Sequence, residues 1–355
     1  MSSNPENQLL KKFTAAGIDA FWTASNSHIT YFTQYLSRES SLLISPKGNI
    51  FFTDSRYRAE ARIALKNRAT VTTVDGSFYA LFADTCVRQR FKKVGFEERY
   101  LTVAAYKNLK KELAARSIRI VPTEGLVEGL RLIKQPGEIK ILRKALEITI
   151  DSFKFAKKIV SPGKKENEVA AELQRYLTLK GARGCAFDTI VASGENSAFP
   201  HHLTSQRRIH NNEVVLIDMG IDYQGYKSDL TRVFFLGRIE VLIKKAYAAV
   251  LKARQEALKI VSPGIPIRDI DRVGRACISE DGFGHFFIHS IGHGVGLDVH
   301  EQPKVWDKAE GVLKSGMVVT IEPGIYLPGK FGIRIEDMVL VTKKGCEVLS
   351  GSLNQ

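Results

Sequence analysis

The sequence has few of the features typical of extracellular or membrane proteins. Its four cysteines stand far apart along 355 residues and form no Cys-x-x-Cys pair, which excludes a disulfide framework and a zinc ribbon. No stretch approaches about 18 consecutive apolar residues, so no transmembrane helix is predicted. The N-terminal residues MSSNPENQLLKKF also lack the apolar run of a secretory signal. These absences predict a cytoplasmic protein with idle thiols and no membrane partner.

The net charge is strongly positive, but the basic residues do not gather in one patch. The sequence has 52 Lys and Arg against 38 Asp and Glu, a net charge of +14. The lysines are scattered, often as pairs such as Lys110-Lys111 and Lys244-Lys245, at the ends or faces of predicted helices. A nucleic-acid interface requires clustered positive charge. The pattern therefore predicts a solvated surface and no nucleic-acid partner.

The first 122 residues alternate short helical and strand-like segments, which is the pattern of an α/β domain. Within them, Ser41–Ile44 and Ile50–Thr53 flank a Pro-Lys-Gly-Asn turn and are predicted to form a hairpin. A long helix is predicted from about Pro136, since proline suits the first helical turn. We therefore expect two domains, at residues 1–125 and 126–355.

The second domain contains an internal repeat. The hexapeptide KIVSPG occurs at Lys158–Gly163 and again at Lys259–Gly264, an offset of 101 (259 − 158). VVLIDMGI at Val214–Ile221 resembles VVTIEPGI at Val318–Ile325, at an offset of 104 (318 − 214). In each copy one helix is predicted to end at Ser-Pro-Gly, and a second helix and strands follow. The domain is therefore predicted to consist of two related halves.

Each half carries two acids at matching positions. In the first half these are Asp218 and Asp229. If Tyr223 pairs with Tyr226 in a hairpin, Asp218 faces Thr231. Asp229 then lies two positions along the same face, within about 7–8 Å of Asp218.

In the second half the matching acids are Glu322 and Glu336. A turn centred on Gly329 would set the two glutamates opposite each other, although Pro323 interrupts the strand. The repeat therefore predicts that four carboxylates converge.

Strands rich in Val, Ile and Leu are poor places for four unpaired carboxylates. Each would cost several kcal/mol or would take up a proton. Two divalent cations would offset the four negative charges. The alternative is that the acids lie exposed on edge strands or pair with Arg232 and Arg334. The duplicated pattern favours a metal centre.

Histidine supplies a further ligand type. His289, His293 and His300 lie in the run HSIGHGVGLDVHE, whose glycines allow close approach of the backbone. The run lacks the lysine of a phosphate-binding loop. His201 and His202 follow a proline in a predicted loop, where an exposed pair is the simpler interpretation.

These blocks together resemble the pita-bread-fold metallopeptidases, the Xaa-Pro aminopeptidases and prolidases. The resemblance rests on FDTIVASGENSAFPHH, VVLIDMGIDYQGYKSDLTRVF, HSIGHGVGLDVHE and MVVTIEPGIYLPGKFGIRIEDMVLV, with IKQPGEIKILRKA as the linker. NSHITYFTQY and FFTDSRY resemble the creatinase-type domain that precedes the catalytic one. The resemblance implies a mixed α/β (α+β) chain: a pita-bread catalytic domain with a pseudo-twofold duplication, after a smaller creatinase-like α/β domain.

The resemblance also implies a two-metal site. The ions would be Mn²⁺, with Co²⁺ or Zn²⁺ as alternatives, and the ligands would be Asp218, Asp229, His293, Glu322 and Glu336. Asp229 and Glu336 would bridge the two ions. Asp218 would complete one, and His293 with Glu322 the other.

The implied catalytic residues are His201, His289, His300, Glu322 and Arg334. Glu322 would move protons, His201 and His300 would donate hydrogen bonds to the oxyanion, and His289 and Arg334 would shape the pocket. The implied reaction is hydrolysis of the N-terminal Xaa-Pro bond of peptides by a hydroxide that bridges the metals. The expected partners are peptides with proline at the second position and a second copy of the chain in a homodimer.

Several alternatives remain at this point. A prolidase would cleave only Xaa-Pro dipeptides, and a pita-bread domain can also be a metal-free binding module. Short methionine aminopeptidases lack a domain like residues 1–122, and creatine-cleaving relatives lack the metal ligands.

Overall fold

The computed structural model describes residues 4–353 and contains two compact units that divide between Arg131 and Leu132. Each unit has its own strands and its own hydrophobic core. Among the described residues, no helix is long and apolar enough to cross a membrane.

The N-terminal unit is a six-stranded sheet with helices, as the alternating pattern predicts. The strand order is β4-β3-β2-β1-β5-β6, with β1, β5 and β6 mutually parallel and β2 antiparallel to both β1 and β3. The elements are α1 (Pro5–Leu10), α2 (Phe13–Ala16), β1 (Ala20–Thr23), α3 (Asn26–Thr33), β2 (Ser40–Ile44), β3 (Ile50–Thr53), α4 (Arg58–Ala64), β4 (Thr70–Thr73), α5 (Phe78–Arg88), β5 (Lys93–Glu97), α6 (Val103–Ala114), β6 (Arg119–Thr123) and α7 (Glu128–Arg131).

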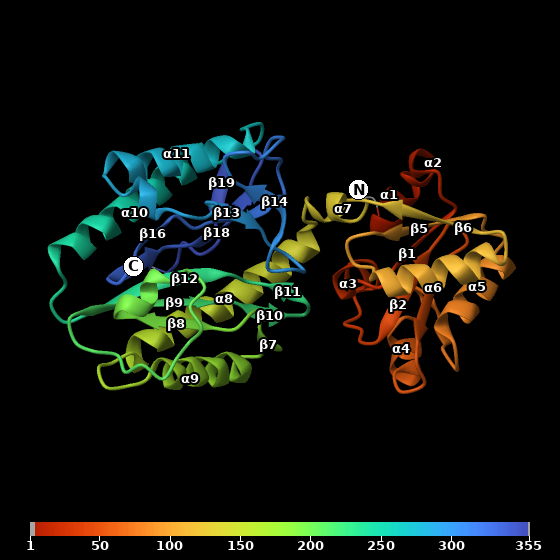
Figure 1. Ribbon diagram of the computed structural model, residues 1–355, viewed down its shortest axis with the longest axis horizontal. Helices are drawn as coiled ribbons and strands as arrows, with labels where there is room; N and C mark the ends of the chain where they lie inside the picture. The colour runs from red at the N-terminus through yellow and green to blue at the C-terminus, as the bar shows by residue number, and fades with distance from the viewer. Residues whose placement is uncertain (1–3, 354–355) are drawn as a thin grey trace. The chain divides into compact units, whose positions relative to one another are not determined.

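Helices α5 and α6 cover one face of this sheet (Figure 1). Phe82 and Cys86 of α5 and Leu109 of α6 are buried against Trp22 and Val94 of the sheet. The predicted β2–β3 hairpin is confirmed, with Leu43 opposite Ile50. The sequence predicted no element at α3, whose run of β-branched and aromatic residues does not favour a helix. That helix is capped by the Ser25 side chain and is almost entirely buried, so burial decides its conformation.

The second unit contains the predicted duplication. Its elements are α8 (Pro136–Ile159), α9 (Glu166–Leu179), β7 (Gly184–Cys185), β8 (Ile190–Ser193), η1 (Gly194–Ala198), β9 (Glu213–Met219), β10 (Ile221–Tyr223), β11 (Tyr226–Lys227), β12 (Leu230–Leu236), α10 (Val241–Ile260), α11 (Ile267–Glu280), η2 (Gly284–Phe286), β13 (Gly292–Gly294), β14 (Glu301–Val305), β15 (Val318–Ile321), β16 (Gly324–Leu327), β17 (Phe331–Arg334), β18 (Asp337–Val341) and β19 (Cys346–Val348). Two helices and a long hairpin therefore occur twice. Figure 1 shows α9 and α11 at opposite edges of this unit, with strands between them.

The two Ser-Pro-Gly turns make the same backbone hydrogen bonds. Gly163 donates its N–H to the Ile209 carbonyl at 2.8 Å, and Gly264 donates to the Leu313 carbonyl at 2.9 Å. Ile209 and Leu313 in turn each donate to the residue after the glycine, at 2.8 and 2.9 Å. Equivalent bonds at equivalent positions confirm that the two halves share one architecture.

The hairpin of the first half has the predicted register. Tyr223 pairs with Tyr226 in β10 and β11, and Asp218 pairs with Thr231 in β9 and β12. The register is continuous, but the ladder is interrupted between Met219 and Ile221, where Gly220 lies. Strand β8 extends this sheet on the other side of β9.

The hairpin of the second half also has the predicted register. Ile325 pairs with Ile333 in β16 and β17, and Ile321 pairs with Asp337 in β15 and β18. These pairs share one register, so the interruption between them leaves Glu322 and Glu336 opposite each other. Pro323 lies in this interruption, as the sequence predicts.

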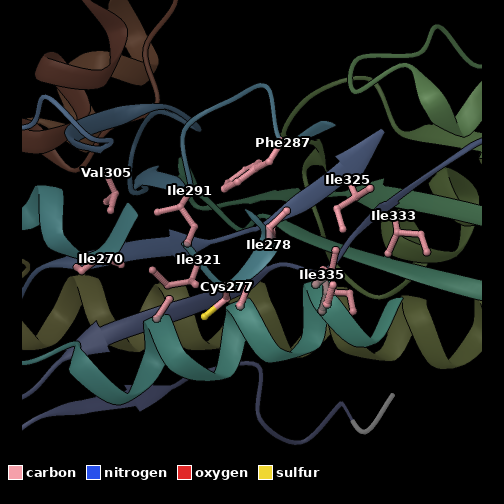
Figure 2. Close-up of a cluster of buried hydrophobic side chains, with 14 of the residues drawn as sticks. Ile270, Cys277, Ile278, Phe287, Ile291, Val305, Ile321, Ile325, Ile333 and Ile335 are labelled. Atoms are coloured by element: carbon pink, nitrogen blue, oxygen red, sulfur yellow. The ribbon is translucent and has the colours of Figure 1, made fainter. Parts of the chain in front are cut away.

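A hydrophobic core of the second unit contains residues of α10, α11 and the second hairpin. Figure 2 shows Ile270 and Ile278 of α11 in one cluster with Ile321 and Ile335. All four side chains are fully buried. The packing fixes the hairpin that carries Glu322 and Glu336 against a rigid helix pair.

Candidate metal centre

The four predicted acids lie at the interruptions of the two hairpins. Asp218 is the last residue but one of β9, and Asp229 lies between β11 and β12. Glu322 follows β15, and Glu336 lies between β17 and β18. Asp218, Asp229 and Glu336 are buried and Glu322 is partly buried, so the alternative of exposed acids on edge strands is wrong.

Side chains from both halves converge around His293. His293 Nε2 lies 3.2 Å from Glu322 Oε1 and 3.6 Å from Asp229 Oδ2. Potential ligand atoms lie within 4.8 Å of one another in three overlapping groups: Asp218, Asp229 and Glu336; His293, Glu322 and Glu336; and Asp229, His293 and His300. Because Glu336 belongs to the first two groups, these could hold two ions that share it.

Three of the acids are strongly destabilised as anions. Burial raises the pKa of Asp218, although Arg334 counteracts the increase. Burial and then the charge of Asp218 raise the pKa of Asp229 well above its ordinary value. Burial and the charges of Asp229 and Glu322 do the same for Glu336. Without a cation, the surroundings therefore disfavour the charged forms of these three carboxyls.

His293 and Glu322 shift in the opposite direction. Burial alone would lower the pKa of His293, but the hydrogen bond and charge of Glu322 raise it to about 9. Burial alone would raise the pKa of Glu322, but His293 lowers it to about 2. His293 Nδ1 lies 3.1 Å from the Gly294 carbonyl, which can only accept, so Nδ1 carries the hydrogen and Nε2 faces the acids. This orientation is the usual one for a metal-binding imidazole.

The donor set fits divalent cations. Asp218 Oδ1 and Glu336 Oε1 are buried and receive no hydrogen bond from any residue in 4–353. Buried carboxylate oxygens are normally satisfied, so atoms without donors at the meeting point of four acids indicate missing positive charge. Oxygen ligands with one imidazole are a common set for divalent metals.

Within residues 4–353, arginine forms an ion pair with only one of the four acids. Arg334 Nη2 lies 2.7 Å from Asp218 Oδ2, as the alternative interpretation expected for this one acid. Arg232 instead pairs with Asp337 at 2.8 Å. A single arginine cannot balance four carboxylates, so these contacts do not replace the cations.

Arg334 also organises the side of the site that holds His289. Its Nη1 donates to the Tyr326 hydroxyl at 2.7 Å and to the Pro200 carbonyl at 3.2 Å. The Tyr326 hydroxyl lies 3.0 Å from His289 Nε2, and His289 Nδ1 lies 2.8 Å from the Ser290 carbonyl. Because a carbonyl only accepts, Nδ1 is protonated. Burial lowers the pKa of His289, so the imidazole is neutral and its Nε2 accepts from Tyr326.

The other predicted histidines lie nearby. The His300 ring is 4.3 Å from the His293 ring in an edge-to-face contact. His201 follows Pro200. Burial lowers the pKa of His300, and the charge of His293 lowers it further. The interpretation of His201 and His202 as an exposed pair holds only for His201, because His202 Nε2 lies 2.9 Å from the buried Glu166.

Three residues around the acids were missed in the sequence. Thr231 donates to Glu336 Oε2 at 2.7 Å, and Thr320 donates to Glu322 Oε1 at 3.2 Å. Tyr326 joins Arg334 to His289. The strand period could have found Thr231 and Thr320, since each lies two positions from a predicted acid on the same face.

The glycines before and after His293 allow strands to approach, as their pattern predicts. A Cβ atom on Gly292 would lie 2.0 Å from the Thr320 carbonyl oxygen. One on Gly294 would lie 2.2 Å from the Gln302 carbonyl oxygen. The backbone of neighbouring strands, not a ligand, occupies this space.

A further group of potential ligands lies in the N-terminal unit. His28 Nδ1 is 2.5 Å from Glu97 Oε2, and Glu128 lies beside them. Burial raises the pKa of Glu97, and a hydrogen bond with Glu128 and the charge of Arg131 oppose the increase. Arginine and histidine already compensate these acids, so we assign no metal here.

Two segments of the chain match known families. Residues 140–343, more than half of the chain, match Metallopeptidase family M24. Residues 7–133 match the Creatinase/Prolidase N-terminal domain. The expected pita-bread domain and its creatinase-like partner are therefore confirmed.

Whole-chain similarity gives the same result. The structure is similar to the Xaa-Pro dipeptidase from Bacillus anthracis, with a TM-score of 0.94, 36% identity, and coverage of 99% of this chain and 98% of that chain. It is also similar to the X-Pro aminopeptidase from Thermotoga maritima MSB8, with a TM-score of 0.88, 34% identity and 97% coverage of each chain. The Xaa-Pro dipeptidase of Pyrococcus horikoshii is 42% identical over 259 residues, 73% of each chain.

The site and the similarities agree. Enzymes of family M24 use divalent metals, and this chain brings together acids and a histidine that could bind them. The chain belongs to metallopeptidase family M24 and is a hydrolase.

Proposed function

We propose that this chain hydrolyses the bond between an N-terminal residue and a following proline, with two divalent metal ions. The observation that carries the proposal is the convergence of Asp218, Asp229, His293, Glu322 and Glu336 from the two halves. Two of these acids also have a buried oxygen that receives no hydrogen bond from residues 4–353. The substrate class comes from the named activities of the relatives, which act on Xaa-Pro bonds.

The metal ions would bind as two overlapping sets. Asp218 would serve one ion, His293 and Glu322 the other, and Asp229 and Glu336 both. We propose Mn²⁺, because an oxygen-rich set with one imidazole suits it. When bound, a metal pair supplies a water nucleophile at neutral pH and polarises the scissile carbonyl.

Glu322 is the proposed proton carrier. A proline nitrogen in a peptide bond has no hydrogen, so it must gain a proton as the C–N bond breaks. The Glu322 carboxylate would take a proton from the attacking water and give it to that nitrogen. Thr320 holds this carboxylate by its hydroxyl at 3.2 Å.

His201 and His300 are the proposed hydrogen-bond donors to the oxyanion that develops at the carbonyl. Removing one such donor typically costs about 3–4 kcal/mol of transition-state stabilisation. His289 and Arg334 are proposed to line the pocket for proline. The Ser290 carbonyl and the Tyr326 hydroxyl occupy both ring nitrogens of His289, so its ring face would be the part available to an apolar group.

Substrate length separates two versions of this function. The aminopeptidase expected from the sequence would accept peptides longer than two residues. The second candidate is a dipeptidase, and the names of the relatives from B. anthracis and P. horikoshii favour it.

The deciding experiment compares Ala-Pro, Ala-Pro-Ala and Ala-Ala as substrates of the Mn²⁺-loaded chain. Hydrolysis of Ala-Pro and not Ala-Ala supports the proposed specificity, and release of alanine from Ala-Pro-Ala assigns the aminopeptidase version. A preparation that holds two metal ions and cleaves none of the Xaa-Pro bonds would refute the proposal. The homodimer and the cytoplasmic location remain predictions from the sequence, which gel filtration and cell fractionation test.

A further inference from the structure

The segment Ser193–Ser205, which we term the His201 loop, carries a histidine proposed to act on the substrate. On one side the loop is attached to β17. Gly332 donates its N–H to Ser197 Oγ at 2.7 Å, and Arg334 donates to the Pro200 carbonyl at 3.2 Å. These two contacts fix the loop only on the side that faces β17.

Glu166, the first residue of α9, provides that second attachment. Its side chain is fully buried. Oε1 accepts from the Ser193 N–H at 2.8 Å, the Ser193 hydroxyl at 2.7 Å and the Asn196 amide at 3.0 Å. These two residues precede His201 in the chain.

The other oxygen of Glu166 binds the part of the loop after His201. Oε2 accepts from the Ser205 N–H at 3.1 Å and from the Ser205 hydroxyl at 2.6 Å. His202 Nε2 lies 2.9 Å from the same oxygen. One carboxylate thus closes the loop, with one oxygen for each arm.

The internal repeat has no acid at the position equivalent to Glu166 in its second half. At the offset of 101 given by the repeated hexapeptide, Glu166 corresponds to Ile267 (267 − 166). Both residues begin a helix and donate their N–H to an equivalent carbonyl, Glu166 to Arg207 at 3.1 Å and Ile267 to Gly311 at 3.2 Å. An apolar side chain therefore suffices at this position in the second half.

A neutral amide cannot replace the carboxylate. A buried carboxylate is costly unless donors surround it, and here six contacts do so. Glutamine offers one acceptor oxygen, so its NH₂ group would face the N–H donors of one arm. Only the carboxylate can hold both arms at once.

We propose that Glu166 is a positioning residue for the reaction, which acts by holding the His201 loop closed so that His201 reaches the substrate. The proposal rests on the proposed function for the role of His201. The placement of the loop by Glu166 is independent of that function and can be measured separately.

The first measurement does not depend on activity. Leu203 is 83% exposed in the loop, so chymotrypsin cleavage after it reports how often the loop opens. Glu166→Gln is expected to speed this cleavage by about tenfold or more, because one arm loses its acceptor. The control is Glu172→Gln on the same helix, where the acid makes only a surface ion pair with Lys164 at 2.6 Å. It should leave the cleavage rate unchanged.

The second measurement uses the metal-loaded enzyme and an Xaa-Pro substrate. Glu166→Gln should lower kcat about 10- to 100-fold and change KM less than about threefold, since an oxyanion donor is misplaced. In a His201→Ala background the same change should alter kcat less than about twofold. A general loss of structure would instead lower kcat by the same factor in both backgrounds.

The outcomes separate the two proposals. The positioning role would be overturned if chymotrypsin cleaved Glu166→Gln and Glu172→Gln after Leu203 at the same rate. It would also be overturned if Glu166→Gln lowered kcat by the same factor in the His201→Ala background as in the wild type. A wild-type enzyme without Xaa-Pro activity would instead refute the proposed function, and the proteolysis would still decide how the loop is held.

Should Glu166→Gln fail to fold, Ser205→Ala takes its place, because it removes one hydroxyl donor and leaves the acid. Faster cleavage after Leu203 in this variant supports the role, and a wild-type rate contradicts it.

Discussion

At the residue scale, the buried acids fall into two kinds. Glu166 and Asp271 are fully buried, and each accepts hydrogen bonds from backbone N–H groups and polar or cationic side chains. Asp218 and Glu336 each have a buried oxygen without a hydrogen-bond donor in residues 4–353. Acids of the first kind stabilise loops by themselves. Acids of the second kind, which meet further acids and His293, are the ones that we propose as metal ligands.

Asp229→Asn tests this distinction. Asp229 belongs to two of the groups of potential ligands, so replacing its carboxylate with a neutral amide should weaken the binding of both ions. We expect at least one equivalent of Mn²⁺ to be lost per chain, measured by elemental analysis after dialysis.

The control for this change is Asp188→Asn, at an exposed aspartate. It should keep full metal content. Two bound ions in Asp229→Asn would contradict the bridging role.

Glu166 should make stability depend on pH. Burial alone would raise its pKa, but hydrogen bonds from Ser205, Ser193 and His202 lower it from 4.5 to about 2. A lowered folded-state pKa gives stability that is present above pH 4.5 and is lost as pH falls towards 2. The shift corresponds to about 3 kcal/mol.

Urea unfolding of the metal-free protein between pH 2.5 and 6 measures this contribution. The wild-type curve should fall more steeply with acid than that of Glu166→Gln, which has no proton to gain. Parallel curves would show that the carboxylate is not selectively stabilised in the folded state.

At the element scale, the four predicted acids lie at or near the interruptions of the two hairpins. The register continues across each gap, while the local ladder is broken at Gly220 in one half and at Pro323 in the other. A regular ladder would alternate side chains strictly between the two faces. At the interruptions this strict alternation does not apply, so the acids beside them can point towards the same region around His293.

Gly220→Ala tests how tightly one break is packed. An added Cβ would lie 1.9 Å from the Ser228 carbonyl oxygen, next to Asp229. We expect the stability of the C-terminal unit to fall by about 3 kcal/mol, with weaker metal binding.

The control, Gly137→Ala, lies in α8 with no atom near its Cβ position. It should leave stability unchanged or raise it by about 0.5 kcal/mol. Thermal unfolding with and without Mn²⁺ measures both variants. If the two variants unfolded at the same midpoint temperature, the interruption at Gly220 would tolerate a side chain.

Local sequence signals predicted these hairpins better than they predicted α3. The turn residues and the period of two fix a hairpin's register within about ten residues. The α3 sequence instead carries residues with strand preference, and tertiary burial of Ile29, Tyr31 and Phe32 overrides that preference.

At the scale of the whole molecule, the predicted metal ligands all lie in the second unit. Its core and all five predicted ligands come from residues after Leu132. The predicted domain boundary between residues 125 and 126 remains a prediction. Residues 126–131 belong to the first unit, where Lys12 Nζ donates to the Leu126 carbonyl at 2.9 Å and the Tyr31 hydroxyl donates to the Leu130 carbonyl at 3.2 Å.

Fragments 126–355 and 132–355 test this organisation. Both should fold and bind two metal ions, because the core and the ligands are intact, and 132–355 should be the more soluble without the apolar side chains of α7. Circular dichroism and elemental analysis measure the outcome. A fragment that is unfolded, or that binds no metal, would show that the second unit depends on the first.

The sequence by itself determined the duplication and the two hairpin registers, because repeats, turns and side-chain alternation are local and can be read along the chain. Only the tertiary structure decided which further groups meet around the predicted acids and histidines. Packing between the halves brings Arg334 to Asp218. Packing within a half brings Tyr326 to His289, and a buried Glu166 to both arms of the His201 loop. Such contacts depend on long-range packing and charge compensation, which leave no periodic signal in the sequence.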